Sequence, residues 1–155
     1  LIEGSPIFFI QQRIGKNNKL FKMYKFRTMM VNTPNVATHL LTNSMNHIHP
    51  FGLILRNLSI DELPNLINII RGEMNFIGPR PALYNQEDLM CLRKKYGIDK
   101  MKPGLSGWAQ INGRDELSIE EKVELEKFYL KNKTFLMDIR ILLKSFYSFL
   151  PININ

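Results

Sequence analysis

The segment Ser59–Pro64, with the sequence SIDELP, constrains the fold more than any other part of the chain. Proline has no backbone N–H, so a helix tolerates Pro64 only close to its N-terminus. Apolar residues around this proline recur at the helical spacing i, i+3, i+4 and i+7, and a glycine follows as a typical stop. The segment therefore predicts a helix start, with Asp61 and Glu62 in or just before the first turn. Ser59 and Glu62 also have the spacing of a capping box.

The rest of the pattern predicts a helix-rich α+β fold, with residues 1–155 forming a single domain. Two apolar runs, separated by the polar segment Gly15–Lys19, are typical of a β-hairpin and predict a small sheet near the N-terminus. Ser118 and Glu121 match a second capping box, which predicts a helix to about Asn132. Two more helices are expected over residues 84–96 and 135–149. Turn chemistry is expected over residues 75–81, and a long structured loop without regular structure over residues 101–114.

The charge of the chain is basic and unevenly distributed. Lys and Arg number 21 against 14 Asp and Glu, a net charge of +7. Residues 1–50 carry six basic and one acidic side chain, residues 51–103 eight and six, and residues 104–155 seven of each. This gradient predicts an acidic partner met mainly by the first two thirds of the chain. The single cysteine, Cys91, excludes an internal disulfide and a cysteine-based zinc site.

The acidic pair has two interpretations. An ionised, partly exposed Asp61 could act as a nucleophile or, with Glu62, hold Mg²⁺. Taken alone, the segment favours the plainer interpretation that acids suit helix starts. Its surroundings favour a phosphate site, because two prolines stiffen the turn that carries Arg80 and a preorganised guanidinium binds phosphate well. The other candidate cations are Lys25, Arg56 and Arg114. For Lys25, a solvated position on an amphipathic strand is an equal alternative.

Taken together, these segments resemble the bacterial sugar transferase family, the monotopic phosphoglycosyl transferases that begin glycan assembly on a polyprenyl phosphate. The matching motifs keep one order over about residues 5 to 143. They are QRIG at 12–15, FKMYKFRTM at 21–29, LR at 55–56, DELPNL at 61–66, GEMNFIGPRP at 72–81, KPGLSGWAQINGR at 102–114 and DIRIL at 138–142.

The resemblance implies a transfer of phosphosugar from a UDP-sugar to polyprenyl phosphate, with release of UMP through an aspartyl intermediate. Asp61 would be the nucleophile. Glu62 would be a Mg²⁺ ligand or a proton acceptor, and both roles stay open. The resemblance implies phosphate or nucleotide binding by Arg80, Lys25 and Arg56, and more weakly by Arg114. The implied cofactor is Mg²⁺, and no role for nucleic acid is implied.

The resemblance also implies the cytoplasmic face of the bacterial inner membrane as the place of action. Family members carry an N-terminal hydrophobic hairpin that the chain does not contain, so we expect an upstream segment to be missing. The apolar residues within 135–150 predict either an interfacial helix or a core helix. Two competing hypotheses are a truncated, inactive family member and a noncatalytic basic module that binds a membrane surface or nucleic acid.

Overall fold

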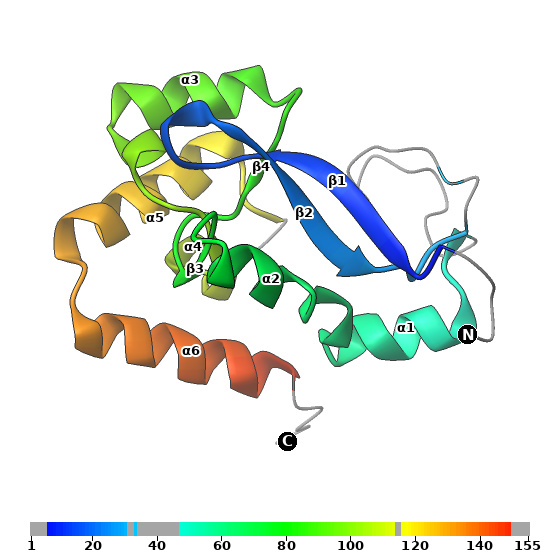
Figure 1. Cartoon of the computed structure of the whole chain (residues 1–155). Helices are drawn as coiled ribbons and strands as arrows, with labels where there is room; N and C mark the ends of the chain where they lie inside the picture. Colours follow the sequence, from blue (N-terminus) through cyan, green and yellow to red (C-terminus); the bar gives the residue numbers. More distant parts are fainter. Residues whose placement is uncertain (1–5, 31–32, 34–46, 114–115, 150–155) are drawn as a thin grey trace.

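The computed structural model describes residues 6–30, 33, 47–113 and 116–149, and these form the expected helix-rich α+β fold (Figure 1). The predicted hairpin is confirmed: β1 (Phe8–Ile14) pairs antiparallel with β2 (Leu20–Phe26) across a short 3₁₀ turn at Lys16–Asn18. Strand β4 (Ala82–Leu83) adds to the other edge of β1, so the order in the sheet is β2-β1-β4. The basic strand β2 of this hairpin packs against the segment 60–70 that comes later in the chain.

The helix start around Pro64 is more broken than the sequence suggests. Helix α1 (Pro50–Asn57) is followed by the 3₁₀ turn η4 (Ile60–Glu62) and then by the short helix α2 (Asn65–Ile70). Asp61 and Glu62 lie in η4, just ahead of α2, as predicted. The predicted capping box at Ser59 is wrong, because Ser59 has a left-handed backbone (φ 53°) and its side chain caps nothing. That kink separates α1 from η4.

Helix α2 turns its apolar side outward. The side chains of Asn65 and Asn68 are fully buried, whereas four apolar side chains of the η4–α2 segment stay exposed. These are Leu63, Leu66, Ile67 and Ile70, the last with an exposed fraction of 86%. The apolar spacing therefore predicted a helix correctly but indicated the wrong side as its buried face.

A second, two-stranded sheet was not predicted. Strand β3 (Asn75–Ile77) pairs parallel with β5 (Gly104–Ser106), and the short helix α4 (Trp108–Ile111) follows. The expectation of a turn at 75–81 is therefore wrong for β3, and the expectation of no regular structure at 101–114 is wrong for β5 and α4. The glycines explain the error: a Cβ on Gly104 would collide with the backbone of Gly78, so these glycines serve close approach of two segments and not flexibility.

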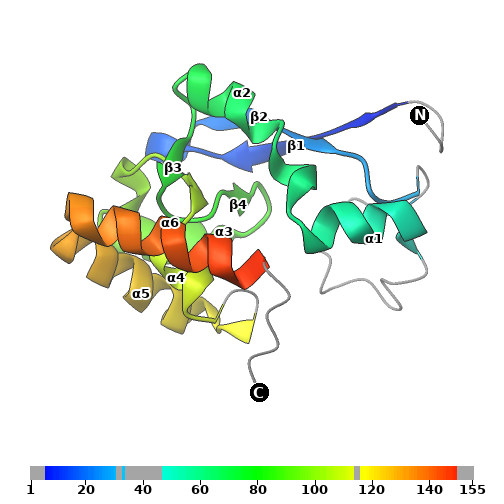
Figure 2. The same ribbon diagram turned by 90° about the horizontal axis from the view of Figure 1, so that it is seen from below.

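The remaining helices confirm the sequence pattern. Helix α3 (Glu87–Lys95) ends before Gly97, which has a φ of +74°. Helix α5 (Ile119–Asn132) starts with the predicted capping box, in which Ser118 and Glu121 exchange hydrogen bonds. Helix α6 (Phe135–Phe149) follows after a short connection and lies below α4 and α5 in Figure 1, so that it is in front of α4 in Figure 2.

Helix α6 has one side buried in the core, as a core helix requires, and one exposed apolar side, which leaves the prediction of an interfacial helix untested. One side is buried in a core cluster: Ile141 is fully buried, Met137 packs beside it, and the hydroxyl of Ser145 is hydrogen-bonded to that of Ser106. The other side leaves large apolar side chains exposed. These are Phe135, Leu136, Ile139, Leu142, Leu143 and Phe146. Among the described residues, none of the helices has the length and apolar character needed to cross a bilayer.

Candidate functional site

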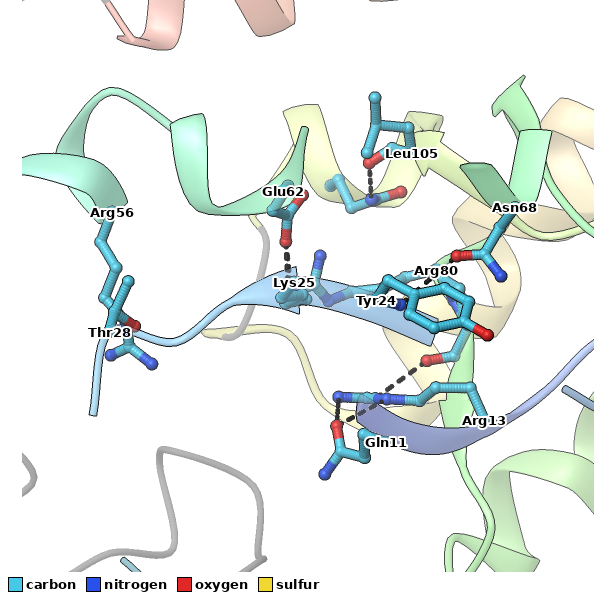
Figure 3. Close-up of polar contacts among 12 residues, drawn as sticks. Gln11, Arg13, Tyr24, Lys25, Thr28, Arg56, Glu62, Asn68, Arg80 and Leu105 are labelled. Carbon is cyan, nitrogen blue, oxygen red and sulfur yellow. Dashed lines mark hydrogen bonds and ion pairs between the residues drawn. The ribbon is translucent and has the colours of Figure 1, made fainter. Parts of the chain in front are cut away.

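The fold brings three of the predicted site residues into direct contact (Figure 3). Lys25 extends from β2, Glu62 from η4, and Arg80 from the turn between β3 and β4. The Lys25 Nζ atom lies 2.6 Å from Glu62 Oε1, and an Arg80 terminal nitrogen lies 3.7 Å from the same oxygen. Lys25 and Glu62 are 37 positions apart in the sequence, and α2 and β3 lie between Glu62 and Arg80, so only the tertiary fold assembles these residues.

Lys25, Glu62 and Arg80 line one cavity of about 230 Å³. Arg13 and Asn65 also line it, and Gly104 and Leu105 of β5 close one side. Two cations thus converge on one carboxylate in a hollow partly open to solvent. Such an arrangement suits an anionic ligand, because the cations are already placed and only partly neutralised.

Asp61 lies beside this cluster and is 9% exposed. Burial raises the pKa of the Asp61 carboxyl, and the negative charge of Glu62 raises it as well. The positive charges of Lys25 and Arg56 and a backbone hydrogen bond oppose that rise. This corrects the sequence-based picture of a partly exposed aspartate whose ionised form is favoured by a helix dipole. Desolvation is the largest influence on its pKa, and the surrounding cations only offset it.

Lys25 is also strongly influenced by its surroundings. Its side chain is 16% exposed, and desolvation lowers its pKa from the ordinary value, helped by the nearby charge of Arg80. The carboxylate of Glu62 acts in the opposite direction through charge and a hydrogen bond. The Lys25–Glu62 pair therefore consists of two mutually dependent groups in the lining of the cavity, and the loss of one would destabilise the charge of the other.

Arg56 lies at the C-terminal end of α1, where its Nε atom donates a 3.0 Å hydrogen bond to Thr28 Oγ1 (Figure 3). The residue is close enough to Asp61 to influence its pKa but is not one of the residues that line the cavity. Arg114, the remaining predicted cation, lies outside the described residues.

Sequence reasoning missed Asn68, which fixes the position of the acidic pair relative to β2. Its amide donates to the Lys22 carbonyl and to Glu73, both at 2.7 Å, and its Oδ1 accepts from the Tyr24 N–H at 3.4 Å. Since these contacts tie α2 to β2 at Lys22 and Tyr24, directly ahead of Lys25, they hold Lys25 opposite Glu62. The available signal was the pair Asn65 and Asn68, which interrupts the helical apolar pattern with spacing i, i+3.

The chemistry of the carboxylate pair fits a hard cation held together with a phosphate. Within the part of the chain that the structure describes, no group of three or more acidic, histidine or cysteine side chains is gathered as a complete metal site. Mg²⁺ in phosphate-handling sites is commonly bound through one or two carboxylates plus substrate oxygens. Asp61 and Glu62 are the residues that could provide this smaller set, together with oxygens of a substrate phosphate.

Comparisons with known proteins identify the family to which this sequence is similar. The family model described as "Bacterial sugar transferase" matches residues 1–151. A Bacillus subtilis protein, the uncharacterized sugar transferase EpsL, is 42% identical over 139 residues, which cover 90% of this chain and 67% of the relative.

Two further relatives carry more specific names. The undecaprenyl-phosphate galactose phosphotransferase of Salmonella typhimurium is 34% identical, with 92% of this chain and 33% of the relative covered. The UDP-glucose:undecaprenyl-phosphate glucose-1-phosphate transferase of Escherichia coli is 36% identical, with 91% and 32% covered. The chain thus spans about a third of the length of these two proteins.

Proposed function

The chain belongs to the bacterial sugar transferase family, and on that premise we propose that it transfers a phosphosugar from a UDP-sugar to a polyprenyl phosphate such as undecaprenyl phosphate. The names of the relatives from Salmonella and Escherichia coli support this choice of acceptor, and the latter name supports a UDP-sugar donor. The transfer would be the first membrane step in assembling a bacterial polysaccharide or glycoconjugate. The observation that carries the proposal is the convergence of Lys25 and Arg80 on Glu62, beside the buried Asp61.

In the proposed reaction Asp61 is the nucleophile. A carboxylate oxygen of Asp61 attacks the phosphorus that carries the sugar, and the bond from that phosphorus to the bridging oxygen breaks, so UMP leaves with the oxygen. An oxygen of polyprenyl phosphate then attacks the same phosphorus. The aspartyl–phosphate bond breaks, the Asp61 carboxylate is regenerated, and polyprenyl diphosphate sugar is released.

The basic residues have a clear electrostatic task in this reaction. A carboxylate that approaches a phosphate at 4 Å meets a repulsion of about 4 kcal/mol at an effective dielectric constant near 20. Lys25, Arg56 and Arg80 supply opposite charge around Asp61, and Arg114 is a further candidate. Mg²⁺ held by Asp61 and Glu62 together with the diphosphate would neutralise further negative charge. Glu62 is proposed as a metal ligand or as a proton acceptor.

The acceptor lipid requires contact with a membrane surface, and we propose that the exposed apolar sides of α1 and α6 provide it. In α1 the large exposed apolar residues are Phe51 and Ile54, and Leu58 at the C-cap continues the spacing of one helix face. Figures 1 and 2 show α1 and α6 along the same side of the molecule. Arg140 and Lys144 are exposed on α6 and would meet anionic headgroups, at about 1 kcal/mol per well-placed charge. These exposed sides support contact with a membrane surface, and the cytoplasmic face of the inner membrane is proposed from the family resemblance.

The test is the release of UMP. Purified protein is incubated with Mg²⁺, polyprenyl phosphate in anionic vesicles and a panel of UDP-sugars, and UMP is quantified. We expect release with at least one sugar, and we expect Asp61→Asn to abolish it while leaving vesicle binding unchanged. A folded wild-type protein that binds vesicles but releases no UMP from any sugar would favour a noncatalytic membrane-binding module or an inactive family member instead.

A further inference from the structure

The turn that carries Arg80 is held at three successive carbonyl groups by three different parts of the fold. The carbonyl of Pro79 accepts from the Gly104 N–H of β5 at 2.9 Å. The carbonyl of Arg80 accepts from a terminal nitrogen of Arg93 in α3 at 2.9 Å. The carbonyl of Pro81 accepts from Arg13 of β1 at 3.1 Å. Because both flanking prolines also fix their own φ angles, the backbone of Arg80 has little freedom.

Arg93 is itself held rigidly. Its Nε atom donates to Glu126 Oε2 at 2.8 Å, and its Nη2 atom donates to Glu126 Oε1 at 2.5 Å. The same Nη2 atom makes the contact with the Arg80 carbonyl. Both side chains are buried, with exposed fractions of 8% and 3%. This two-point pairing fixes the plane of the guanidinium. It therefore also fixes the direction in which Nη2 donates its hydrogen bond to the Arg80 carbonyl.

The pair is remote from the proposed reaction in every other respect. Arg93 does not line the cavity that contains Lys25 and Glu62; it lines a separate cavity together with Pro79. Among the described residues, it is linked to the site through its hydrogen bond to the Arg80 backbone. A buried ion pair adds little net stability compared with apolar side chains of similar volume, so stability alone does not account for it.

We propose that Arg93 and Glu126 are positioning residues that aim the Arg80 guanidinium at the substrate diphosphate. The pair links α3 and α5 to the turn, so the rigid helical part of the domain sets the direction from which Arg80 enters the cavity. This inference rests on the proposed function for the identity of the anion, a sugar-linked diphosphate. It adds two residues that touch neither substrate nor reacting atoms.

The test replaces both charges at once. In the double variant R93M/E126L no buried charge is left unpaired, and exchanges of this kind are often neutral for stability. We expect unfolding by urea close to that of wild type and a fall of about 10- to 100-fold in kcat/KM for the UDP-sugar, because small misplacements of a binding group have effects of this size. The matched control, E124L/K127M, removes the exposed pair on α5 and should leave kcat/KM unchanged.

A cycle with Arg80 distinguishes positioning from a general structural role. In an Arg80→Ala background the double replacement should change kcat/KM less than about twofold, because the group that it positions is gone. An equal loss in both backgrounds would overturn the proposal, and so would full activity in a folded R93M/E126L protein. If that variant does not fold, Arg93→Lys takes its place, because lysine keeps the charge but cannot serve both partners in one plane.

Binding of inorganic pyrophosphate, measured by calorimetry, needs no turnover and separates this proposal from the proposed function. Weaker binding in R93M/E126L than in wild type, with no such difference in the Arg80→Ala background, supports the positioning role even if no UDP-sugar releases UMP. Equal pyrophosphate binding by folded wild type and R93M/E126L, or wild-type binding that does not depend on Arg80, overturns it.

Discussion

Two clusters of ionised side chains lie on either side of the Arg80 turn, and they are built in opposite ways. On the helical side, Arg93 and Glu126 form a closed pair with matched charge and two short hydrogen bonds, almost out of contact with solvent. On the strand side, Glu62 meets both Lys25 and Arg80 in a partly open cavity, with Asp61 buried beside them. Arg80 belongs to both, through its carbonyl to the first and its guanidinium to the second.

The difference distinguishes a cluster that fixes the geometry of the Arg80 turn from a cluster that can bind a ligand. The Arg93–Glu126 pair has no charge left over, so it can only fix geometry. In the strand-side cluster, cations outnumber carboxylates among the described residues. Lys25 and Arg80 contact Glu62, Arg13 lines the same cavity, and Arg56 is close enough to influence the pKa of Asp61. This cluster also contains two groups whose pKa values are displaced by burial toward their neutral forms. Unmatched charge and displaced pKa values are typical of sites that await a ligand.

The largest expected effect is on the free energy of unfolding when one partner of the closed Arg93–Glu126 pair is removed. Glu126→Ala leaves the Arg93 guanidinium buried without its partner, which should lower the free energy of unfolding by about 3–5 kcal/mol. Urea unfolding monitored by circular dichroism measures this. Glu124→Ala, which breaks the exposed pair with Lys127, should cost less than about 1 kcal/mol and is the control. Similar losses in the two variants would remove the distinction between the clusters.

The next effect is on activity at the open cluster. Lys25→Met removes one of the two cations in contact with Glu62 but keeps the aliphatic bulk of the side chain. We expect kcat/KM for UMP release to fall by about 10²-fold, the effect typical of losing one electrostatic contact to a developing charge. Lys22→Met, on the same strand, is the matched control and should retain activity. A Lys25→Met protein with wild-type kcat/KM would exclude Lys25 from phosphate binding.

A smaller effect concerns the dependence of stability on pH. The pKa of Asp61 is raised in the folded state, so the folded protein holds this proton more tightly, and ionisation of Asp61 costs stability as pH rises through the folded pKa. Asp61→Asn should therefore be more stable than wild type at pH 7, with an advantage that shrinks as pH falls through the raised folded pKa and is gone below about 4, the ordinary pKa of aspartate.

Glu121 gives the opposite sign and serves as the reference for that experiment. Its hydrogen bonds with Ser118 lower its pKa. Glu121→Ala should therefore be less stable than wild type at pH 7, with a deficit that shrinks in acid. Urea unfolding at a series of pH values measures both variants. An Asp61→Asn protein that loses stability relative to wild type as pH rises would contradict the assigned direction.

The smallest effect on stability is expected outside both clusters, on the exposed side of α6. Leu143→Glu and Phe146→Glu together should change the unfolding free energy by less than about 1 kcal/mol, because these side chains are already in contact with solvent. They should strongly reduce sedimentation with anionic vesicles at low salt. Ile141→Ala is the contrasting variant, since it empties a fully buried position and should cost about 2–5 kcal/mol. Unchanged vesicle binding by the first variant would remove α6 from the membrane contact.

Particular residues show what the sequence could and could not predict. The hairpin, the capping box at Ser118 and the position of Asp61 just before a helix rest on local chemistry, and the sequence predicted them. The parallel pairing of β3 with β5 depends on two glycines meeting from distant segments, which no local pattern reveals. The buried side of α2 was misjudged because Asn68 finds three partners on β2 and its own turn, and such satisfaction is visible only in three dimensions.

The same reasoning applies to the candidate site. The order of motifs indicated the family, and the family resemblance suggested the site residues. These residues, which the fold brings into one region, are Asp61, Glu62, Lys25, Arg56 and Arg80. The surroundings of Asp61 were misjudged: the sequence suggested a partly exposed carboxylate, whereas burial is the largest influence on its pKa and raises it. Arg93 and Glu126 gave no signal at all, since a residue that acts only through the backbone of another has no motif of its own.

The central claim is that Asp61 forms a covalent bond to the phosphosugar, and mass spectrometry tests it most directly. The protein is incubated with Mg²⁺ and the UDP-sugar that gives UMP, without polyprenyl phosphate, and then digested and mapped. The account predicts a phosphosugar adduct on the peptide that contains Asp61, its loss when polyprenyl phosphate is added, and its absence in Asp61→Asn. An adduct that persists in Asp61→Asn, or that maps to a different residue, would contradict the account.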